Sequence, residues 1–221
     1  MGAGTHQRGG LNLSSIDLAA LAAKVERLDA IDQIRQLASK YAIGIDMRDM
    51  DAIAGLYVED VKTSKTESGR QSMKQVMARV LSTFTSSVHH VGNHIIEFDD
   101  ADNAHGVVYC RCEHEIGDKW LPMYLHYLDN YRRVDGRWYF RRRLNQALYV
   151  VDMLERPTGP KKVRWPHSEP TEGNWHSTYP SWGKFWTDPV AAGNEPVLPT
   201  PAEEKFLERL RAGSSKPRSS Y

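Results

Sequence analysis

The stretch VVYCRCEHEI, residues 107–116, alternates between the two faces of an extended chain. An alternation of this kind predicts a β-strand with one apolar face turned toward a core. His114 belongs to that apolar face, where a single histidine is more often a core residue than a catalyst. The apolar face would carry Val108, Cys110, Cys112, His114 and Ile116, and the opposite face Tyr109, Arg111, Glu113 and Glu115.

The sequence around this strand predicts an antiparallel meander preceded by helices. From residue 87 onward, runs rich in Val, Ile, Tyr and Trp are separated by DDADNAHG, GDK and VDGR, and the last contains an Asp-Gly hairpin signal. Upstream, apolar residues recur at helical spacing over residues 18–45. Shorter helices are expected to end near Tyr57 and to cover residues 70–84. This order favours an α+β fold in which helices cover one face of a curved antiparallel sheet.

Residues 155–221 differ in composition from the rest of the chain. They contain ten of the eleven prolines, which disfavour a sheet interior, and four of the six tryptophans. Because such large rings are usually buried, we expect an extended arm across the domain or a neighbouring subunit, with a short helix near residues 201–213. The chain therefore divides into a flexible N-terminus at 1–14, an α+β domain at 15–154 and the arm at 155–221.

The composition narrows the possible partners. The 29 Lys and Arg residues nearly balance the 28 Asp and Glu residues, so the net charge of +1 favours neither nucleic acid nor a membrane surface. No apolar run approaches the roughly 20 residues that span a bilayer, and MGAGTHQRGG lacks the apolar core of a secretory signal. Cys110 and Cys112 share a face, are expected too far apart for a comfortable disulfide, and suit a reducing compartment. We expect a cytoplasmic protein that acts on small molecules or proteins.

Three histidines fall within six residues of SVHHVGNHIIEFDD, residues 87–100. His90 and His94 would lie roughly 13 Å apart on one face of a strand, too far to share a metal ion with ligand bonds of about 2.1 Å. His89 and His90 point to opposite faces, and Gly92–Asn93 is a candidate bulge, so periodicity does not choose between these histidines. No HExxH, CxxC, P-loop, GxGxxG or Gly-x-Ser-x-Gly motif occurs, and we expect no metal site.

Four segments together resemble the SnoaL-like branch of the superfamily named after nuclear transport factor 2 and ketosteroid isomerase, nearest to its scytalone and bile-acid dehydratases. The segments are YAIGIDMRDMDAI at the end of the long helix, HHVGN in the second half, His114 on the next strand, and YRRVDGRWYFRRR at the last hairpin. The resemblance covers about residues 29–152. It implies a cone of helices and curved sheet around a deep, mostly apolar pocket, and an activity that needs no cofactor.

The resemblance also implies roles for individual residues. His89 matches the catalytic histidine of the family, and Asp46 matches its pocket aspartate. Tyr41 matches the tyrosine of the bile-acid dehydratase pattern, and His114 falls where scytalone dehydratases have a second histidine. The second tyrosine of scytalone dehydratases has no counterpart, since its position falls near Lys65.

A histidine paired with an aspartate can act as a general base. A carboxylate bonded to one imidazole nitrogen fixes the tautomer and makes the other nitrogen more basic. His89 with Asp46 would then remove a proton beside a carbonyl group or from a phenol, and Tyr41 or His114 would donate to the departing oxygen or stabilise an oxyanion.

The last two strands supply candidates for substrate binding. Alternation places Arg142 on the side of Trp138 and Phe140, where it would be a buried cation facing an anionic group. The full set of candidates is Tyr127, Asn130, Trp138, Phe140, Arg142 and Asn145.

Three functions fit these residues. The first is a cofactor-independent lyase, of the dehydratase or retro-aldol type, on a bulky aromatic, lignin-derived diaryl, polyketide or steroid molecule, with the arm closing the pocket. The second is an isomerase or cyclase that uses the same base without a leaving group. The third is a non-catalytic role, as a ring-hydroxylating dioxygenase subunit or a protein-binding module. The pairing of His89 with Asp46 favours an enzyme, and the relatives of this pattern suggest a homodimer or homotrimer.

Overall fold

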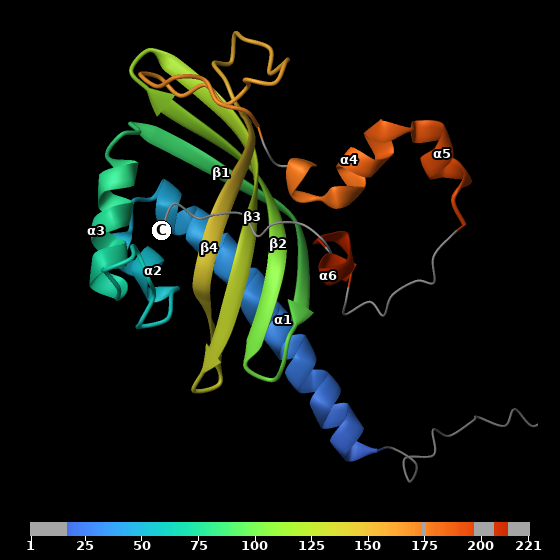
Figure 1. Ribbon diagram of the computed structural model, residues 1–221. Coiled ribbons are helices and arrows are strands. Elements are labelled where there is room, and N and C mark those ends of the chain that lie inside the picture. The colour runs from blue at the N-terminus through green and yellow to red at the C-terminus, as the bar shows by residue number, and fades with distance from the viewer. Residues whose placement is uncertain (1–16, 174–175, 197–205, 212–221) are drawn as a thin grey trace, which may run out of the picture.

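The computed structural model describes residues 17–173, 176–196 and 206–211 (Figure 1). Three helices come first, α1 (Leu18–Asp46), α2 (Met50–Gly55) and α3 (Arg70–Leu81). Four strands follow, β1 (Ser86–Phe98), β2 (Asn103–Ile116), β3 (Lys119–Val134) and β4 (Arg137–Val150). The C-terminal part contains the 3-10 helix η2 (His176–Thr178) and the helices α4 (Pro180–Thr187), α5 (Pro189–Asn194) and α6 (Phe206–Arg211). The segment 1–14, expected to be flexible, and Trp175 lie outside the described residues.

Local sequence signals account for where these elements begin and end. Asp17 caps α1, because its side chain accepts hydrogen bonds from backbone N–H groups of the first turn at 3.0 and 3.1 Å. After α1 ends at Asp46, Arg48 takes a left-handed backbone φ of 58°, which turns the chain toward α2. Between β3 and β4, Asp135 and Gly136 both have positive φ, 49° and 76°, as a two-residue Asp-Gly hairpin turn requires.

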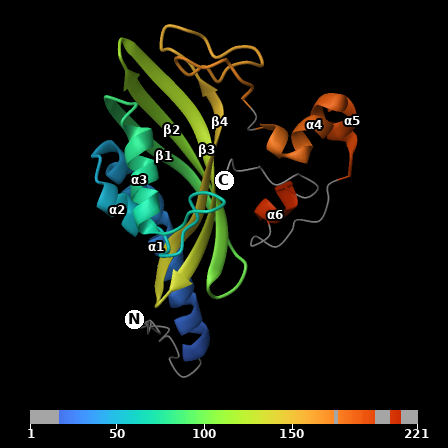
Figure 2. The same cartoon turned by 60° about the vertical axis from the view of Figure 1, so that its left-hand side comes forward.

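The four strands form one antiparallel sheet in the order β1-β2-β3-β4. Helices α1, α2 and α3 lie on one face of the curved sheet, here called the inner face, and α4, α5 and α6 lie on the other, the outer face (Figures 1 and 2). The predicted α+β architecture with a C-terminal arm is confirmed. Within the described ranges, no helix is long and apolar enough to cross a membrane.

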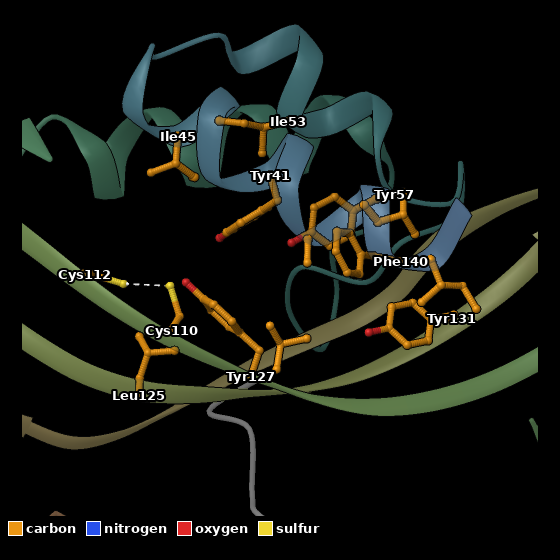
Figure 3. Close-up of a cluster of buried hydrophobic side chains, with 14 of the residues drawn as sticks. Tyr41, Ile45, Ile53, Tyr57, Cys110, Cys112, Leu125, Tyr127, Tyr131 and Phe140 are labelled. Carbon is orange, nitrogen blue, oxygen red and sulfur yellow. Dashed lines mark hydrogen bonds between the residues drawn. The ribbon is translucent and has the colours of Figure 1, made fainter. Parts of the chain in front are cut away.

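The main core fills the space between α1 and the inner face of the sheet. Aromatic side chains from both layers meet there, with Tyr41 and Tyr57 on the helical side facing Tyr127 and Phe140 on the strands (Figure 3). Removal of these apolar groups from water is the main force that holds the helices on the sheet. Side chains with 0% exposure come from both layers and include Ile34, Ile53, Val108, Cys112 and Phe140.

A β-bulge in β1 moves His94 to the inner face. The pairing of β1 with β2 shifts between Val91 and His94, which confirms the bulge predicted at Gly92–Asn93. Val91 packs against the core before the bulge, and Nε2 of His94 lies 3.0 Å from the core hydroxyl of Tyr131 after it. The expectation that His94 shares the face of His90 is therefore wrong, because the bulge reverses the alternation.

A second bulge, in β4, decides which arginine enters the core. Successive residues of β3 pair with Arg142 and then with Phe140, so Arg141 is the extra residue. Arg143 consequently shares the inner face with Phe140, and its side chain is 3% exposed. Arg142 is exposed. The prediction that Arg142 is the buried cation beside Trp138 and Phe140 is wrong, and Arg143 occupies that place.

The first part of the arm extends the edge of the sheet. Residues 160–173 run beside the end of β4, where the N–H of Val150 donates to the carbonyl of Lys162 at 2.9 Å. The N–H of Arg164 donates to the carbonyl of Val150 at 2.7 Å. This pairing brings the next residue, Trp165, over the inner core, against which it packs.

The later part of the arm covers the outer face. Leu207 on α6 is 3% exposed and packs against Val107 and Leu128 of the sheet. The tryptophans of α4 are not enclosed in the same way, since Trp182 and Trp186 remain 43% and 60% exposed. The described parts of the arm therefore include contacts with their own domain, through Trp165 on the inner face and Leu207 on the outer face.

Candidate active site

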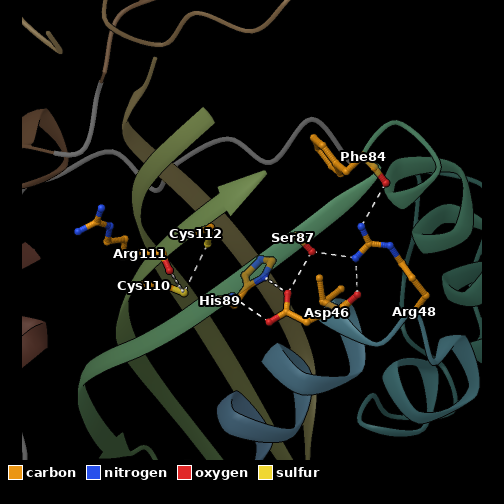
Figure 4. A network of polar contacts seen from close by, with 9 residues as sticks. Asp46, Arg48, Phe84, Ser87, His89, Cys110, Arg111 and Cys112 are labelled. Atoms are coloured by element: carbon orange, nitrogen blue, oxygen red, sulfur yellow. Dashed lines mark hydrogen bonds and ion pairs between the residues drawn. The ribbon is translucent and has the colours of Figure 1, made fainter. Parts of the chain in front are cut away.

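A carboxylate and an imidazole meet where α1 ends beside β1 (Figure 4). Asp46 is the last residue of α1, and its Oδ1 lies 2.7 Å from Nδ1 of His89 on β1. Its Oδ2 accepts the backbone N–H of His89 at 2.8 Å, and its Oδ1 also accepts the hydroxyl of Ser87 at 3.0 Å. Three donors therefore hold one carboxylate, and the two side chains that the resemblance paired are in contact.

This pair is shielded from water. The side chains of His89 and Asp46 are 7% and 12% exposed. Burial acts to raise the pKa of Asp46, but the hydrogen bonds from the ring and backbone of His89 and from Ser87 outweigh it, so the pKa is lowered. An ionised Asp46 accepts the proton of Nδ1, which leaves Nε2 of His89 as the nitrogen that can take a proton.

Arg48 and Ser87 support the pair, and neither was identified from the sequence. Nη1 of Arg48 donates to the Ser87 hydroxyl at 2.8 Å and to the carbonyl of Ile45 at 2.6 Å. Nη2 of Arg48 donates to the carbonyl of Phe84 at 3.2 Å. Because the hydroxyl oxygen of Ser87 accepts from Arg48, its proton is directed to Asp46. The sequence signal was the position of Ser87 two residues before His89, on the same face of the strand.

His114 lies beside His89, on the neighbouring strand β2. Its ring centroid is 5.6 Å from that of His89, and the rings are nearly perpendicular, at 88°. Burial and, to a smaller extent, the proximity of His89 together lower the pKa of His114 to about 4, so His114 is neutral at neutral pH. The ring of Phe84, which follows α3, and that of Trp165, in the arm, flank His114 at centroid distances of 4.5 and 5.8 Å. The structure therefore brings His114 to the His89–Asp46 pair.

Tyr41 belongs to a different part of the core. Its ring meets those of Tyr127 and Phe140 edge-on, at 5.9 and 6.0 Å. Burial raises the pKa of Tyr41 to about 12, against the opposing effect of Arg143, so the phenol stays protonated. Among the described residues, its contacts are with this aromatic group rather than with Asp46.

A buried ion pair lies beside this aromatic group. Arg143 binds Asp129 through two hydrogen bonds of 2.9 and 2.7 Å, and the two side chains are 3% and 0% exposed. The guanidinium carbon lies 4.0 to 4.6 Å from the ring centroids of Tyr41, Tyr127 and Phe140. Burial opposes the charge of Arg143, but Asp129 outweighs it, and the pKa of Arg143 is raised. Nη1 of Arg143 is buried and has no hydrogen-bond partner within the described ranges.

The predicted substrate-binding residues separate into two groups. Tyr127 and Phe140 lie on the inner face and are buried, and Asn145, paired with Tyr127, lies on the same face but is exposed. Asn130 and Arg142 pair with each other and are exposed, and their position beside Asp129 and Arg143 on the alternating strands places them on the outer face.

Trp138 is buried in the core but also lines a separate open cleft. The cleft has a volume of about 480 Å³ and lies between α1 and the start of β4, where Gln33 and Arg137 also line it. The backbone N–H of Trp138 donates to Gln33 at 3.2 Å, so this residue joins the helix to the strand. The cleft does not include His89 or Asp46.

No group of three or more His, Cys, Asp or Glu side chains in the described ranges is arranged to hold a metal ion. Cys110 and Cys112 are both free thiols, and their sulfur atoms lie 3.5 Å apart in a hydrogen bond on the inner face (Figure 4). They share a buried face of β2, as the alternation predicts.

The fold and the polar pair define a class of cone-shaped α+β proteins with a histidine and an aspartate on the inner face of the sheet. A family model for the SnoaL-like domain matches residues 26–144, more than half of the sequence. The chain belongs to the SnoaL-like domain family. The match ends within β4, so the arm lies outside the part that the family shares.

Solved structures of similar fold include two enzymes named for eliminations. A candidate scytalone dehydratase from Novosphingobium aromaticivorans is 23% identical, with a TM-score of 0.52 over 66% of this chain and 99% of that one. A type 3 hexachlorocyclohexane dehydrochlorinase from Novosphingobium barchaimii is 22% identical, with a TM-score of 0.55 over 62% of this chain and 99% of that one. At these identities the likeness concerns the fold. Comparison with curated protein sequences gives no significant match.

Proposed function

We propose that this chain is a cofactor-independent lyase that acts on a bulky aromatic, lignin-derived diaryl, polyketide or steroid molecule. The observation that carries the proposal is the 2.7 Å contact between Nδ1 of His89 and Oδ1 of Asp46, in a position where both side chains are largely shielded from water. A carboxylate bonded to Nδ1 fixes the tautomer of the imidazole and makes Nε2 more basic, which suits a general base. Both structural relatives are named for eliminations, which supports a lyase.

In the proposed reaction, Nε2 of His89 removes a proton from a carbon beside a carbonyl group, or from a phenol. In a dehydration, the electron pair of the broken C–H bond moves onto the carbonyl oxygen and then returns to expel a hydroxyl group from the β carbon. In a retro-aldol cleavage, His89 instead removes the proton of a hydroxyl group on the carbon β to a carbonyl group. The hydroxyl oxygen then forms a new C=O bond, the carbon–carbon bond breaks, its electron pair is taken up as the enolate of the acceptor carbonyl group, and the protonated His89 returns its proton to that enolate. In a dehydration, the protonated His89 gives its proton to the departing hydroxyl group, so that water leaves and the base is restored. Asp46 stays ionised throughout, consistent with its lowered pKa, and stabilises the imidazolium.

Three groups are candidates for stabilising the developing oxyanion. His114 lies nearest to the base, and it is neutral, so it can donate one hydrogen bond. Tyr41 remains a protonated donor, because burial raises its pKa to about 12. Arg143 offers a buried N–H that none of the described residues accepts. Preorganised donors of this kind act strongly where water is excluded.

The aromatic side chains of the inner face support this substrate class. Tyr41, Tyr127 and Phe140 are buried around the Arg143 cation, a composition that suits a ligand with flat rings and an oxygen or anionic substituent. In this proposal Trp165 of the arm, whose ring centroid lies 5.8 Å from that of His114, closes the site over His114.

The test is a panel of phenolic dimers, aromatic polyketides and hydroxysteroids incubated with the full chain and followed by mass spectrometry. Loss of the mass of water would identify a dehydratase, and loss of the mass of formaldehyde a retro-aldol lyase. A product of unchanged mass would identify the isomerase or cyclase instead. Binding without any product would favour the non-catalytic role.

On a verified substrate, His89→Ala tests the base directly. We expect turnover to fall by about 10²–10⁴-fold, because among the described residues no other imidazole is hydrogen-bonded to Asp46 to accept the proton. His90→Ala is the matched control, since His90 is the next residue and is exposed. Full turnover by His89→Ala would remove His89 from the mechanism.

A further inference from the structure

An apolar stripe on the first half of α1 is exposed to solvent. Leu18, Leu21, Val25 and Leu28 are 74%, 50%, 56% and 66% exposed. These four residues are called the N-terminal stripe below. A contiguous row of large apolar side chains on a soluble protein marks an interaction surface, whereas single exposed leucines do not.

A different face of the same helix packs on the sheet. Ile34, Ala38, Tyr41 and Ile45 are 0%, 1%, 9% and 2% exposed because they pack on the sheet, and at 3.6 residues per turn they lie on the side of α1 opposite to the stripe. The first half of α1 instead projects beyond the ends of the strands, as both views of the molecule show (Figures 1 and 2). The N-terminal stripe therefore lies on the side of α1 that faces away from the sheet, and none of the described residues covers it.

The spacing of the stripe fits another helix of the same kind. Its four residues follow one another at intervals of three, four and three positions. This is the spacing of the a and d positions in two heptads of a coiled coil. A second copy of this chain supplies a helix with the identical, self-complementary stripe. Because the domain already holds α1 in the helical form, pairing would not require a new helix to nucleate.

The charges beside the stripe fit a second copy in parallel orientation. With Leu18 and Val25 at a positions, Lys24 falls at g and Asp29 at e, and both are exposed. In a parallel pair, a g residue lies opposite the e residue five positions later, so Lys24 would meet Asp29 of the partner subunit, and the reverse. An antiparallel pair would instead bring the two Lys24 side chains together, and their repulsion disfavours it.

We propose that the N-terminal stripe is a dimer interface, in which two copies of this chain pair their α1 helices in parallel as a short coiled coil. The interface spans two heptads, so the dimer forms in a concentration-dependent manner. This proposal is independent of the catalytic function, since the stripe lies at the opposite end of α1 from Asp46.

Sedimentation velocity of the full chain over a range of concentrations tests the interface. In Leu28→Glu, two carboxylates would face each other across the pair, and we expect the dissociation constant of the dimer to rise about tenfold or more. Ile43→Glu is the matched control, because Ile43 is also 66% exposed and lies on α1 outside the stripe. A wild-type chain that stays monomeric at every concentration, or equal effects of the two changes, would overturn the proposal.

A charge exchange tests the parallel orientation. Lys24→Asp and Asp29→Lys each place like charges opposite each other, and each should weaken the dimer by about threefold. The double variant restores opposite charges and should recover the wild-type dissociation constant. Asp29 also accepts a hydrogen bond from Gln33 at 2.7 Å. This bond is lost in both Asp29→Lys and the double variant, so it does not affect the comparison between them. A double variant as weak as Asp29→Lys would rule out the parallel pair.

Discussion

At the scale of single residues, the role of Asp46 can be tested by a substitution that keeps the shape of its side chain. Asp46→Asn keeps the shape of the side chain but replaces one acceptor by an NH2 group, which must then face either the ring or the backbone N–H of His89. We expect turnover on a verified substrate to fall by about 10²–10³-fold. Nitrogen-15 NMR should show that the His89 ring no longer holds a single tautomer.

Asp51→Asn provides the comparison for this change. Asp51 is an 83% exposed carboxylate that pairs with Lys74, away from His89, and its replacement should leave both turnover and the imidazole spectrum unchanged. A single His89 tautomer retained in Asp46→Asn would show that the carboxylate does not orient the ring.

The buried His114 predicts a loss of stability in acid. Burial lowers its pKa from 6.5 in the unfolded chain to about 4 in the folded protein. Between these values the unfolded state binds more protons, so the free energy of unfolding falls as the pH falls from 6.5 toward 4. The contribution of this one group is about 3 kcal/mol over that window. Urea unfolding at several pH values should show a shallower pH dependence for His114→Asn than for the wild-type chain.

The control for this measurement is His90→Asn, which should keep the wild-type pH dependence because His90 is exposed. Part of the dependence should remain in His114→Asn, since burial also lowers the pKa of His94, to about 3. If His114→Asn and the wild-type chain had the same slope, His114 would not be held neutral by the fold.

The family resemblance identified some residues of the candidate site from the sequence. Residues that reach the site through long-range contacts could not be identified in this way. The resemblance paired Asp46 with His89, and the structure places them in contact, although their catalytic roles remain proposals. Arg48 was missed because its contact with Ser87 joins residues 39 positions apart and requires a left-handed backbone at Arg48 itself. No local pattern of side chains encodes such a contact.

At the scale of elements, two of the three register shifts in the sheet, the bulges at Gly92–Asn93 and Arg141, decide which polar side chains enter the core. Strict alternation predicts the faces correctly along β2, where the pairing with both neighbours carries Cys110, Cys112 and His114 to the inner face as expected. It fails for His94 and Arg142, because each follows or flanks a bulge. The bulge in β1 was predictable from Gly92–Asn93, whereas RRR around Arg141 contains no residue that favours a bulge. The bulge at Arg141 brings Arg143 to the inner face, where it pairs with Asp129.

The docking of α6 on the outer face depends on one buried carboxylate. Glu97 is 1% exposed, accepts the backbone N–H groups of Leu207 and Glu208, and lies 3.3 Å from Nε2 of His105. Glu97→Ala leaves these N–H groups without that acceptor, at a cost of about 1–3 kcal/mol for local opening. Hydrogen exchange should become faster at residues 207 and 208, while the amides of β2 and β3 stay protected.

Asp99→Ala is the matched control for α6, because Asp99 contacts the other ring nitrogen of His105 at 2.9 Å. It should not change exchange at residues 207 and 208. Equal acceleration in the two variants would mean that His105, rather than Glu97, holds the helix.

At the scale of the whole molecule, the sheet has a different covering on each face. The helices that precede it form the inner layer, and the arm forms part of the outer layer while its first segment extends the edge of β4. The hydrophobic periodicity of α1 and of the strands was enough to predict that the preceding helices cover one face of the sheet. The expectation that the arm buries its tryptophans holds for Trp165 but not for Trp182 and Trp186, which are 43% and 60% exposed. The route of the arm was not predictable, because a Pro-rich segment has no periodicity from which to assign a face.

The two ends of the arm should therefore have separable effects, and two tryptophans provide the test. Trp165→Ala removes the ring that packs 5.8 Å from His114 and opens the inner face to water, so turnover of a bulky substrate should fall and its KM should rise. Trp182→Ala removes a ring of the same size from α4, where it stacks on His176 at 3.9 Å and is 43% exposed. Turnover should then be unchanged, because α4 lies on the outer face. Steady-state kinetics of both full-length variants make the comparison. Equal losses of turnover would mean that the arm acts on the site through the stability of the whole domain, and unchanged kinetics in Trp165→Ala would mean that the arm does not close the site.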